Sequence, residues 1–196
     1  MNAQRPWMGP PRRYDRGMTL VELLGVLSIL AILMGIGIPG MHRLVAGTRA
    51  ESSMTELFGL LGSARQTAIL TRREVTLCGT ANGTACSRNW DGMPTLVFID
   101  SNRNRRADEN EEIFQVAQTT GSARIRWSAS GNRNYLRYRP DGGVKEFGSF
   151  TYCPEDGDAR GARQIILSAT GRPRSAVDSD GDGIVEDQNG IPLSCN

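Results

Sequence analysis

Histidine and lysine are almost absent from this chain of 196 residues, in which each occurs once. The single histidine, His42, follows a long apolar run and cannot serve a nucleophile in the polar remainder of the chain. A zinc site is excluded, because the four cysteines lack the spacing of zinc ligands and have no histidine beside them. A glycine-rich phosphate loop of the Walker type is also missing. These absences predict a protein that is not an enzyme.

Net charge is also scarce once the first residues are set aside. The formal charge is +2, but residues 1–17 hold four arginines against one aspartate. The remaining chain has 19 basic and 20 acidic residues, a net charge of −1. Because positive flanks stay on the cytoplasmic side of a membrane, the basic segment is typical of a topology signal.

No charged side chain occurs between Glu22 and His42, a run of 19 residues. At about 1.5 Å per residue the run spans roughly 28 Å, close to the thickness of a bilayer core. We therefore predict a single transmembrane helix over residues 18–41. The glycines and the proline within it are tolerated in membrane helices, and small residues favour close helix packing.

A short motif joins the basic segment to the apolar run: Gly17-Met18-Thr19-Leu20-Val21-Glu22. An ordinary secretory signal is cleaved after its apolar stretch, whereas this candidate site precedes it. The motif resembles the class III signal of type IV prepilins and type II secretion pseudopilins, although phenylalanine is commoner than methionine after the glycine. The resemblance implies a leader, residues 1–17, that prepilin peptidase cleaves between Gly17 and Met18, and N-methylation of Met18.

The same resemblance implies an inner-membrane protein with one span, a periplasmic C-terminal domain and other pilin subunits as partners. It also implies a role for Glu22 in assembly. A charge at the membrane face costs several kcal/mol unless it is paired. In pilins the equivalent acid is thought to meet the α-amino group of a neighbouring subunit, which sets the stagger of assembly. The alternative is an unpaired acid that reaches toward the interface.

Apolar residues at intervals of three and four predict that the helix continues as an amphipathic segment over residues 42–73. We expect one helix from about residue 19 to 71. The predicted buried face consists of Met54, Leu57, Phe58, Leu61, Ala64, Ala68 and Ile69.

Short β-rich runs separated by turn clusters follow the helix and predict a β domain over residues 74–196. The predicted strands are 74–78, 95–99, 113–117, 123–127, 136–139, 144–147 and 164–167. Strands this close together indicate antiparallel sheets. The predicted class is α+β, and the resemblance implies the type IV pilin fold, in which a long N-terminal helix packs on antiparallel sheets.

Five further segments resemble the GspH/FimT group: residues 65–68, the end of the first predicted strand at 78–79, and residues 95–104, 140–142 and 168–172. This likeness implies a FimT-like minor pilin of a type IV pilus, a group in which some members bind DNA during natural transformation. The alternative is a GspH-type minor pseudopilin of a type II secretion system. A more distant alternative is a calcium-dependent adhesion or surface-binding module.

Basic residues outnumber acidic ones by ten to five between residues 121 and 175. Gly171-Arg172-Pro173-Arg174 matches the Gly-Arg-x-Arg pattern of DNA-binding FimT proteins. Arginine forks bind phosphate oxygens, and we expect the proline to fix a turn that presents both arginines. The predicted contacts with double-stranded DNA are Arg172 and Arg174, with Arg137, Arg139 and Arg163. The alternative is a solvated, arginine-rich sheet face.

Two acidic loops resemble calcium loops, with oxygen-bearing residues at alternate positions. The first consists of Asp178, Asp180, Asp182 and Glu186, with Asn189 where a calcium loop has its last glutamate. The second runs from Asp100 to Glu111 and has Arg105 in place of the turn glycine. Calcium is the only cofactor that the sequence suggests, and the alternative is a pair of solvated turns. The acidic segment 176–196 is also expected to lie against the basic face, where it would compete with DNA.

The four cysteines all follow the apolar run, in the compartment that the topology predicts to be oxidising. Four cysteines allow three pairings. We favour Cys78–Cys86, which closes a short loop, and Cys153–Cys195, which fixes the C-terminus. The alternative is that some remain reduced and buried.

Overall fold

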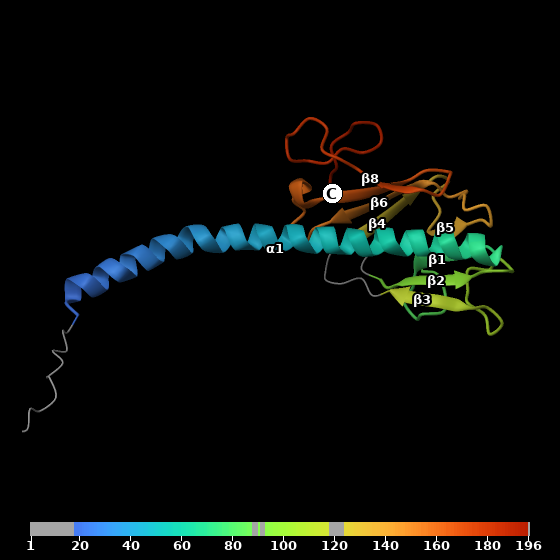
Figure 1. The fold of residues 1–196 in the computed structure, drawn as a ribbon, viewed down its shortest axis with the longest axis horizontal. Helices are drawn as coiled ribbons and strands as arrows, with labels where there is room; N and C mark the ends of the chain where they lie inside the picture. Colours follow the sequence, from blue (N-terminus) through green and yellow to red (C-terminus); the bar gives the residue numbers. More distant parts are fainter. Residues whose placement is uncertain (1–17, 88–89, 91–92, 118–123, 196) are drawn as a thin grey trace, which may run out of the picture. The chain divides into compact units, whose positions relative to one another are not determined.

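A computed structural model describes residues 18–87, 90, 93–117 and 124–195, with the side chains of residues 36–44 and 46 outside the description. The chain divides into two compact units, residues 1–43 and residues 44–196. Figure 1 labels the helix and most of the strands.

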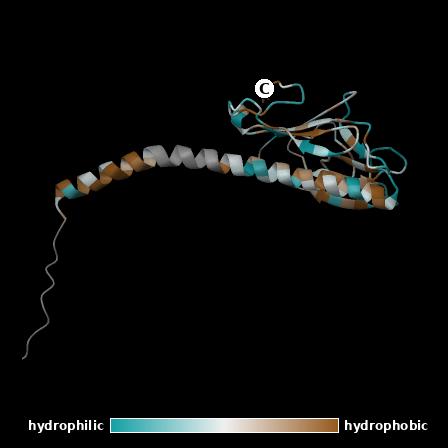
Figure 2. Ribbon diagram, turned by 45° about the horizontal axis from the view of Figure 1, so that its top comes forward, coloured by the Kyte–Doolittle hydropathy of each residue, from teal (hydrophilic) through white to brown (hydrophobic). Residues whose placement is uncertain are grey.

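One α-helix, α1, runs from Leu20 to Thr71, as the sequence predicts. Thr19 caps its N-terminus: the Thr19 side-chain oxygen accepts a hydrogen bond from the Glu22 N–H at 3.2 Å, and the Thr19 carbonyl accepts one from the Leu23 N–H at 3.1 Å. This pattern is the start of a capping box, which satisfies N–H groups that a helix leaves without partners. Figure 2 shows that the first turns of α1 are largely hydrophobic.

Over the part of the chain whose side chains are described, no helix is both long and apolar enough to cross a membrane. The predicted span over residues 18–41 includes residues 36–41, whose side chains lie outside that part.

Two antiparallel sheets of four strands follow the helix. In the first, with the order β3-β2-β1-β5, the strands are β1 (Val75–Gly79), β2 (Thr95–Ile99), β3 (Ile113–Ala117) and β5 (Tyr135–Tyr138). In the second, with the order β4-β6-β7-β8, they are β4 (Arg124–Ala129), β6 (Gly148–Cys153), β7 (Arg163–Leu167) and β8 (Pro173–Ser175). A 3-10 turn, η1 (Ala159–Gly161), precedes β7. The predicted α+β class with antiparallel sheets is confirmed.

The core of residues 44–196 lies between α1 and both sheets. Six residues of α1 that repeat at intervals of four and three are buried: Ala50, Met54, Leu57, Leu61, Ala64 and Ala68. They share one cluster with inward residues of both sheets, which include Val75, Leu77, Leu136, Phe150 and Ile165. The prediction was wrong for Phe58 and Ile69, each 39 % exposed, because they lie one position beyond this buried stripe.

Two local predictions about strands and turns were wrong. Residues 144–147 form no strand. Val144 instead makes a single bridge to Tyr138, and the strand β6 begins at Gly148. The segment around Pro173 is not a turn but the strand β8, paired with β7 through Leu167 opposite Pro173. Proline is tolerated there because β8 is an edge strand and its missing N–H breaks no ladder bond. The remaining strand predictions agree with the structure within two residues at each described end; Ala123 lies outside the described residues.

Both favoured disulfides are present. Cys78 bonds to Cys86 with a Cα–Cα distance of 5.4 Å, and Cys153 bonds to Cys195 with a Cα–Cα distance of 5.5 Å. The second bond ties the C-terminal segment to β6. The loop-closure model assigns about 4 kcal/mol to a closed loop of 42 residues and about 2.5 kcal/mol to one of 8.

Tyr138 is fully buried, and its hydroxyl has no hydrogen-bond partner among the described residues. Burial raises the pKa of its phenol. An unpaired buried hydroxyl costs about 1 to 3 kcal/mol. We therefore expect Tyr138→Phe to raise the free energy of unfolding by about 1 kcal/mol in urea titrations followed by circular dichroism. A loss of stability of that size would show that the hydroxyl has a partner and would contradict this expectation.

Candidate functional site

The predicted processing and assembly residues lie at the start of the described chain. Gly17 and the rest of the leader lie outside the described residues. Met18 is 64 % exposed and directly precedes the cap residue Thr19. Glu22 is exposed in the first turn of α1, and its carboxylate has no hydrogen bond or ion pair with any described part of the chain. The acid is therefore available to a group from outside the subunit.

Two turns meet beside α1 and bring two of the five predicted arginines, Arg139 and Arg172, to one cavity. In the turn after β5, the Gly142 N–H donates to the Arg139 carbonyl at 2.8 Å. In the turn between β7 and β8, the Gly171 N–H donates to the Ser168 carbonyl at 2.9 Å. A Cβ on Gly171 would overlap the Gly142 carbonyl oxygen, and Gly171 has a positive φ of 74°. Only glycine allows this approach without strain.

A surface cavity of about 490 Å³ opens at the meeting of these turns with α1. Three arginines contribute to its lining. The full lining is Arg65, Arg139, Asp141, Gly143, Ala169, Thr170 and Arg172. The Arg65 Nε donates to the Gly142 carbonyl at 3.0 Å, so α1 is hydrogen-bonded to the turn that carries Arg139. Sequence reasoning missed Arg65, since it lies 77 positions from Gly142 and no local pattern links the two.

The charged side chains at and near the cavity differ in whether they have a partner of opposite charge. Arg139 forms an ion pair with Asp141 at 2.8 Å. The hydrogen bond from the Gly143 N–H, together with the Arg139 guanidinium, holds the pKa of the Asp141 carboxyl below its ordinary value. Arg172 and Arg174 are exposed, and neither side chain has a hydrogen bond or ion pair with another described residue. They are therefore the two arginines of the predicted set that stay free to bind an anion.

The other two predicted DNA contacts already have acidic partners. Arg137 is only 14 % exposed and lies 3.6 Å from Asp100 and 3.7 Å from Glu74. Arg163 pairs with Glu51 of α1 at 3.0 Å and also donates to the carbonyls of Arg160 and Ala162. We leave Arg137 and Arg163 out of the candidate interface, because each guanidinium already lies within ion-pair distance of a carboxylate.

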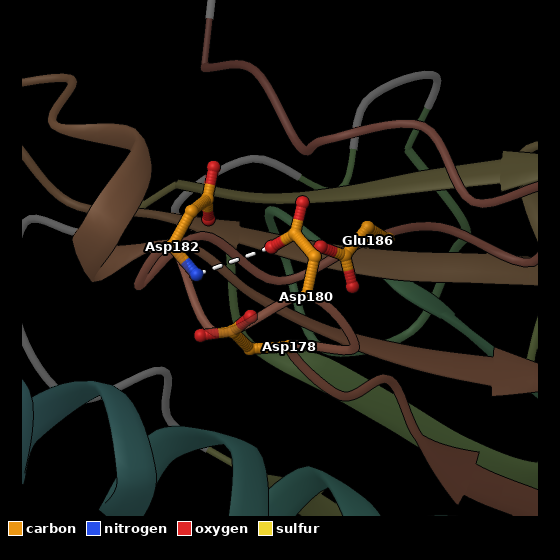
Figure 3. Close-up of side chains that lie close together, drawn as sticks. All are labelled: Asp178, Asp180, Asp182 and Glu186. Carbon is orange, nitrogen blue, oxygen red and sulfur yellow. Dashed lines mark hydrogen bonds between the residues drawn. The ribbon is translucent and has the colours of Figure 1, made fainter.

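The second candidate site is the acidic loop that follows β8. Ligand oxygens of Asp178, Asp180, Asp182 and Glu186 all lie within 4.8 Å of one another (Figure 3). Among the described residues, this is the one group of acidic, histidine or cysteine side chains close enough to hold a metal ion. The three aspartates are exposed, whereas Glu186 is buried. The sequence pattern predicted these four residues but contained no signal that Glu186 would be buried.

The other acidic loop is arranged differently. Asp100 is fully buried and takes hydrogen bonds from the Thr76 hydroxyl and the Arg105 N–H. Side-chain amides of Asn102 and Asn104 donate to Asp108 and lower the pKa of its carboxyl. Arg105, which replaces the turn glycine, adopts a positive φ of 65°. Among the described residues the acids of this loop form no group close enough to hold a metal ion, and Asp100 lies 3.6 Å from the Arg137 guanidinium, so we propose no calcium site there.

The C-terminal segment lies against the second sheet. The Arg126 side chain on β4 donates to the Ser194 carbonyl at 3.4 Å, and Val185 and Leu193 pack with Ala162. The segment therefore contacts one basic residue, Arg126, through its backbone, and the expectation that its acids lie against the basic face stays a prediction. Competition with DNA stays a prediction.

Comparisons with known proteins agree with this architecture. The family model described as "Type II transport protein GspH" matches residues 53–171, and the model of the prokaryotic N-terminal methylation motif matches residues 12–38. The chain is 33 % identical over 166 residues to the pilin-like protein PilA1 of Thermus thermophilus, across 81 % of this chain and 97 % of that protein.

Two crystal structures of the type IV minor pilin FimU from Pseudomonas aeruginosa resemble the chain. Each has a TM-score of 0.49; the identities are 17 and 18 %, over 74 and 81 % of this chain and 99 and 100 % of those chains. Family membership rests on the two family models and on the pilin-like relative. The chain belongs to the GspH family of pilin-like proteins and carries the N-terminal methylation motif of that class.

Proposed function

We propose that this chain is a FimT-like minor pilin that enters a type IV filament and binds double-stranded DNA through Arg172 and Arg174. In this proposal prepilin peptidase cleaves after Gly17 and methylates Met18. The apolar start of α1 then anchors the subunit in the inner membrane, with residues 44–196 in the periplasm, until it assembles with other pilins. Its role is structural and not catalytic.

The observation that supports the DNA proposal is that the side chains of Arg172 and Arg174 have no hydrogen bond or ion pair among the described residues. Both flank Pro173 at the start of an exposed edge strand, and they have no acidic partner among the described residues. Arg172 directly precedes β8 and Arg174 lies within it, and residues two apart along extended backbone are separated by about 6.6 Å. Two guanidinium groups so placed bind phosphate oxygens without reading bases, which suits uptake of DNA of any sequence.

The test is binding of the full-length chain in detergent micelles to a fluorescent DNA duplex, followed by anisotropy at several salt concentrations. Each phosphate contact contributes about 0.9 to the slope of log K against log salt. We expect Arg172→Ala/Arg174→Ala to reduce that slope by about 2 and to weaken binding at low salt at least about tenfold.

The matched control is Arg124→Ala/Arg160→Ala, which removes the same net charge. Arg124 and Arg160 are exposed arginines without a side-chain partner among the described residues. The strand register puts Arg124 opposite Cys153, at the end of the second sheet far from Pro173. Equal losses in both double variants would assign binding to net charge alone and would refute the proposed interface.

The description of the matching family model favours a second candidate, a GspH-type minor pseudopilin of a type II secretion system. The two candidates share fold and processing and differ in cargo. A wild-type chain that fails to bind duplex DNA at low salt would leave the secretion role as the better proposal.

A further inference from the structure

We propose that the loop from Asp178 to Glu186 binds one calcium ion, which fixes the C-terminal segment against the second sheet. The first observation is the convergence of four carboxylates from one short loop, all with ligand oxygens within 4.8 Å of one another (Figure 3). Four carboxylates this close repel one another when ionised unless a cation lies between them.

The second observation is a buried carboxylate oxygen with no donor. Glu186 is 6 % exposed. Its Oε2 accepts hydrogen bonds from the Ser179 N–H at 2.7 Å and the Ser179 hydroxyl at 2.9 Å. Its Oε1 has no hydrogen-bond partner among the described residues. An ionised oxygen held away from water without a partner is costly, and a cation removes that cost.

The aspartates of the loop also have side-chain oxygens available to bind a cation. One oxygen of Asp180 accepts from the Asp182 N–H at 3.1 Å, and one oxygen of Asp182 accepts from the Ile184 N–H at 2.7 Å. No hydrogen bond engages the second oxygen of either side chain within the described chain. The Asp178, Asp180 and Asp182 positions correspond to the first, third and fifth of a calcium loop, with Gly183 at the sixth and the Ile184 carbonyl at the seventh. Glu186, at the ninth, supplies a buried carboxylate.

The size of the group favours calcium over magnesium. Two oxygens on opposite sides of a calcium ion, each at about 2.4 Å, are about 4.8 Å apart. The same pair around magnesium, at about 2.1 Å, is at most about 4.2 Å apart. A spread within 4.8 Å accommodates the larger ion, and a loop that supplies several protein oxygens suits calcium better than magnesium, which usually keeps several waters.

The site lies within the segment that joins β8 to the disulfide at Cys195. Val185, next to Glu186, packs with Leu193 and with Ala162 in a small apolar cluster. Cys195 is bonded to Cys153 on β6. An ion at Glu186 would thus fix the middle of a segment whose end the disulfide already holds, and it would offset the charge of a stretch that has five acids and no base.

The test is isothermal titration of the full-length oxidised chain in detergent micelles, first with calcium chloride and then with magnesium chloride. We expect one calcium ion per chain and binding of magnesium at least about tenfold weaker. Saturating calcium should also raise the melting temperature by about 5 to 10 °C relative to EDTA.

Two variants and one control separate the site from the general effect of charge. Glu186→Gln and Asp180→Asn should each weaken calcium binding at least about tenfold. Asp180→Asn keeps an oxygen that can accept from the Asp182 N–H, so it tests the site even if Glu186→Gln destabilises the fold. Glu155→Gln removes an exposed acid outside the loop and should bind like wild type. The absence of calcium binding to the wild-type chain, equal binding of magnesium, or an equal loss in Glu155→Gln would each overturn the proposal.

Discussion

Gly148→Ala should lower the free energy of unfolding of the full-length oxidised chain by about 3 kcal/mol or more. Gly148 opens β6 and pairs with Ala129 of β4. A Cβ there would overlap the Ser128 carbonyl oxygen and lie 2.8 Å from the Ala129 Cα. Both are backbone atoms, which cannot rotate out of the way, so β4 and β6 must separate. The measurement is urea unfolding followed by circular dichroism, with an expected shift of the midpoint by about 1 M or more.

Gly59→Ala is the matched control, since it makes the same chemical change in the exposed part of α1. A Cβ at Gly59 meets no atom within 4 Å. Alanine is favoured over glycine inside a helix by about 1 kcal/mol, so this variant should be more stable than wild type. If Gly148→Ala and Gly59→Ala shift the urea midpoint in the same direction, then backbone contact between β4 and β6 does not restrict position 148 to glycine.

Glu22→Ala should be cleaved and methylated like wild type but should enter filaments at a small fraction of the wild-type level. Glu22 is exposed and has no partner in the described part of its own chain. A carboxylate at the membrane face is costly unless it is paired, and the α-amino group of a neighbouring Met18 would supply that pair. The measurement compares sheared filaments with membranes by immunoblot, and mass spectrometry of the mature N-terminus reports processing.

The control is Glu56→Ala, which removes an exposed acid farther along the same helix. Glu56 also lacks a described partner, and it lies outside the apolar start of α1, so assembly should be unaffected. Normal incorporation of Glu22→Ala, or equal loss in both variants, would rule out the pairing role of Glu22. A chain that retains its leader would instead identify residue 22 as part of peptidase recognition.

Local patterns along the chain were sufficient for α1 and for most strands. The uncharged run after Glu22 predicted the first part of the helix, and apolar residues at intervals of three and four predicted most of its buried side. The strand around Gly148 escaped prediction, because glycine and serine at its start have low strand propensity. Only the pairing with β4 shows why glycine is required there. The turn predicted at Pro173 was wrong for a related reason. A proline is compatible with a strand only at a sheet edge, and the sequence alone does not show which strand lies at the edge.

The sequence by itself determined the processing motif, the long helix and the segments rich in positive or negative charge, and it favoured one of three cysteine pairings. Each of these depends on neighbours within a few positions or on the identity of single residues. The tertiary structure decided which charges remain free. Arg163 is neutralised by Glu51, 112 positions away, and Arg137 by Asp100, whereas Arg172 and Arg174 have no such partner among the described residues. Burial of Glu186 likewise depends on how the C-terminal segment packs, because burial and ion pairing join parts of the chain that no local pattern connects.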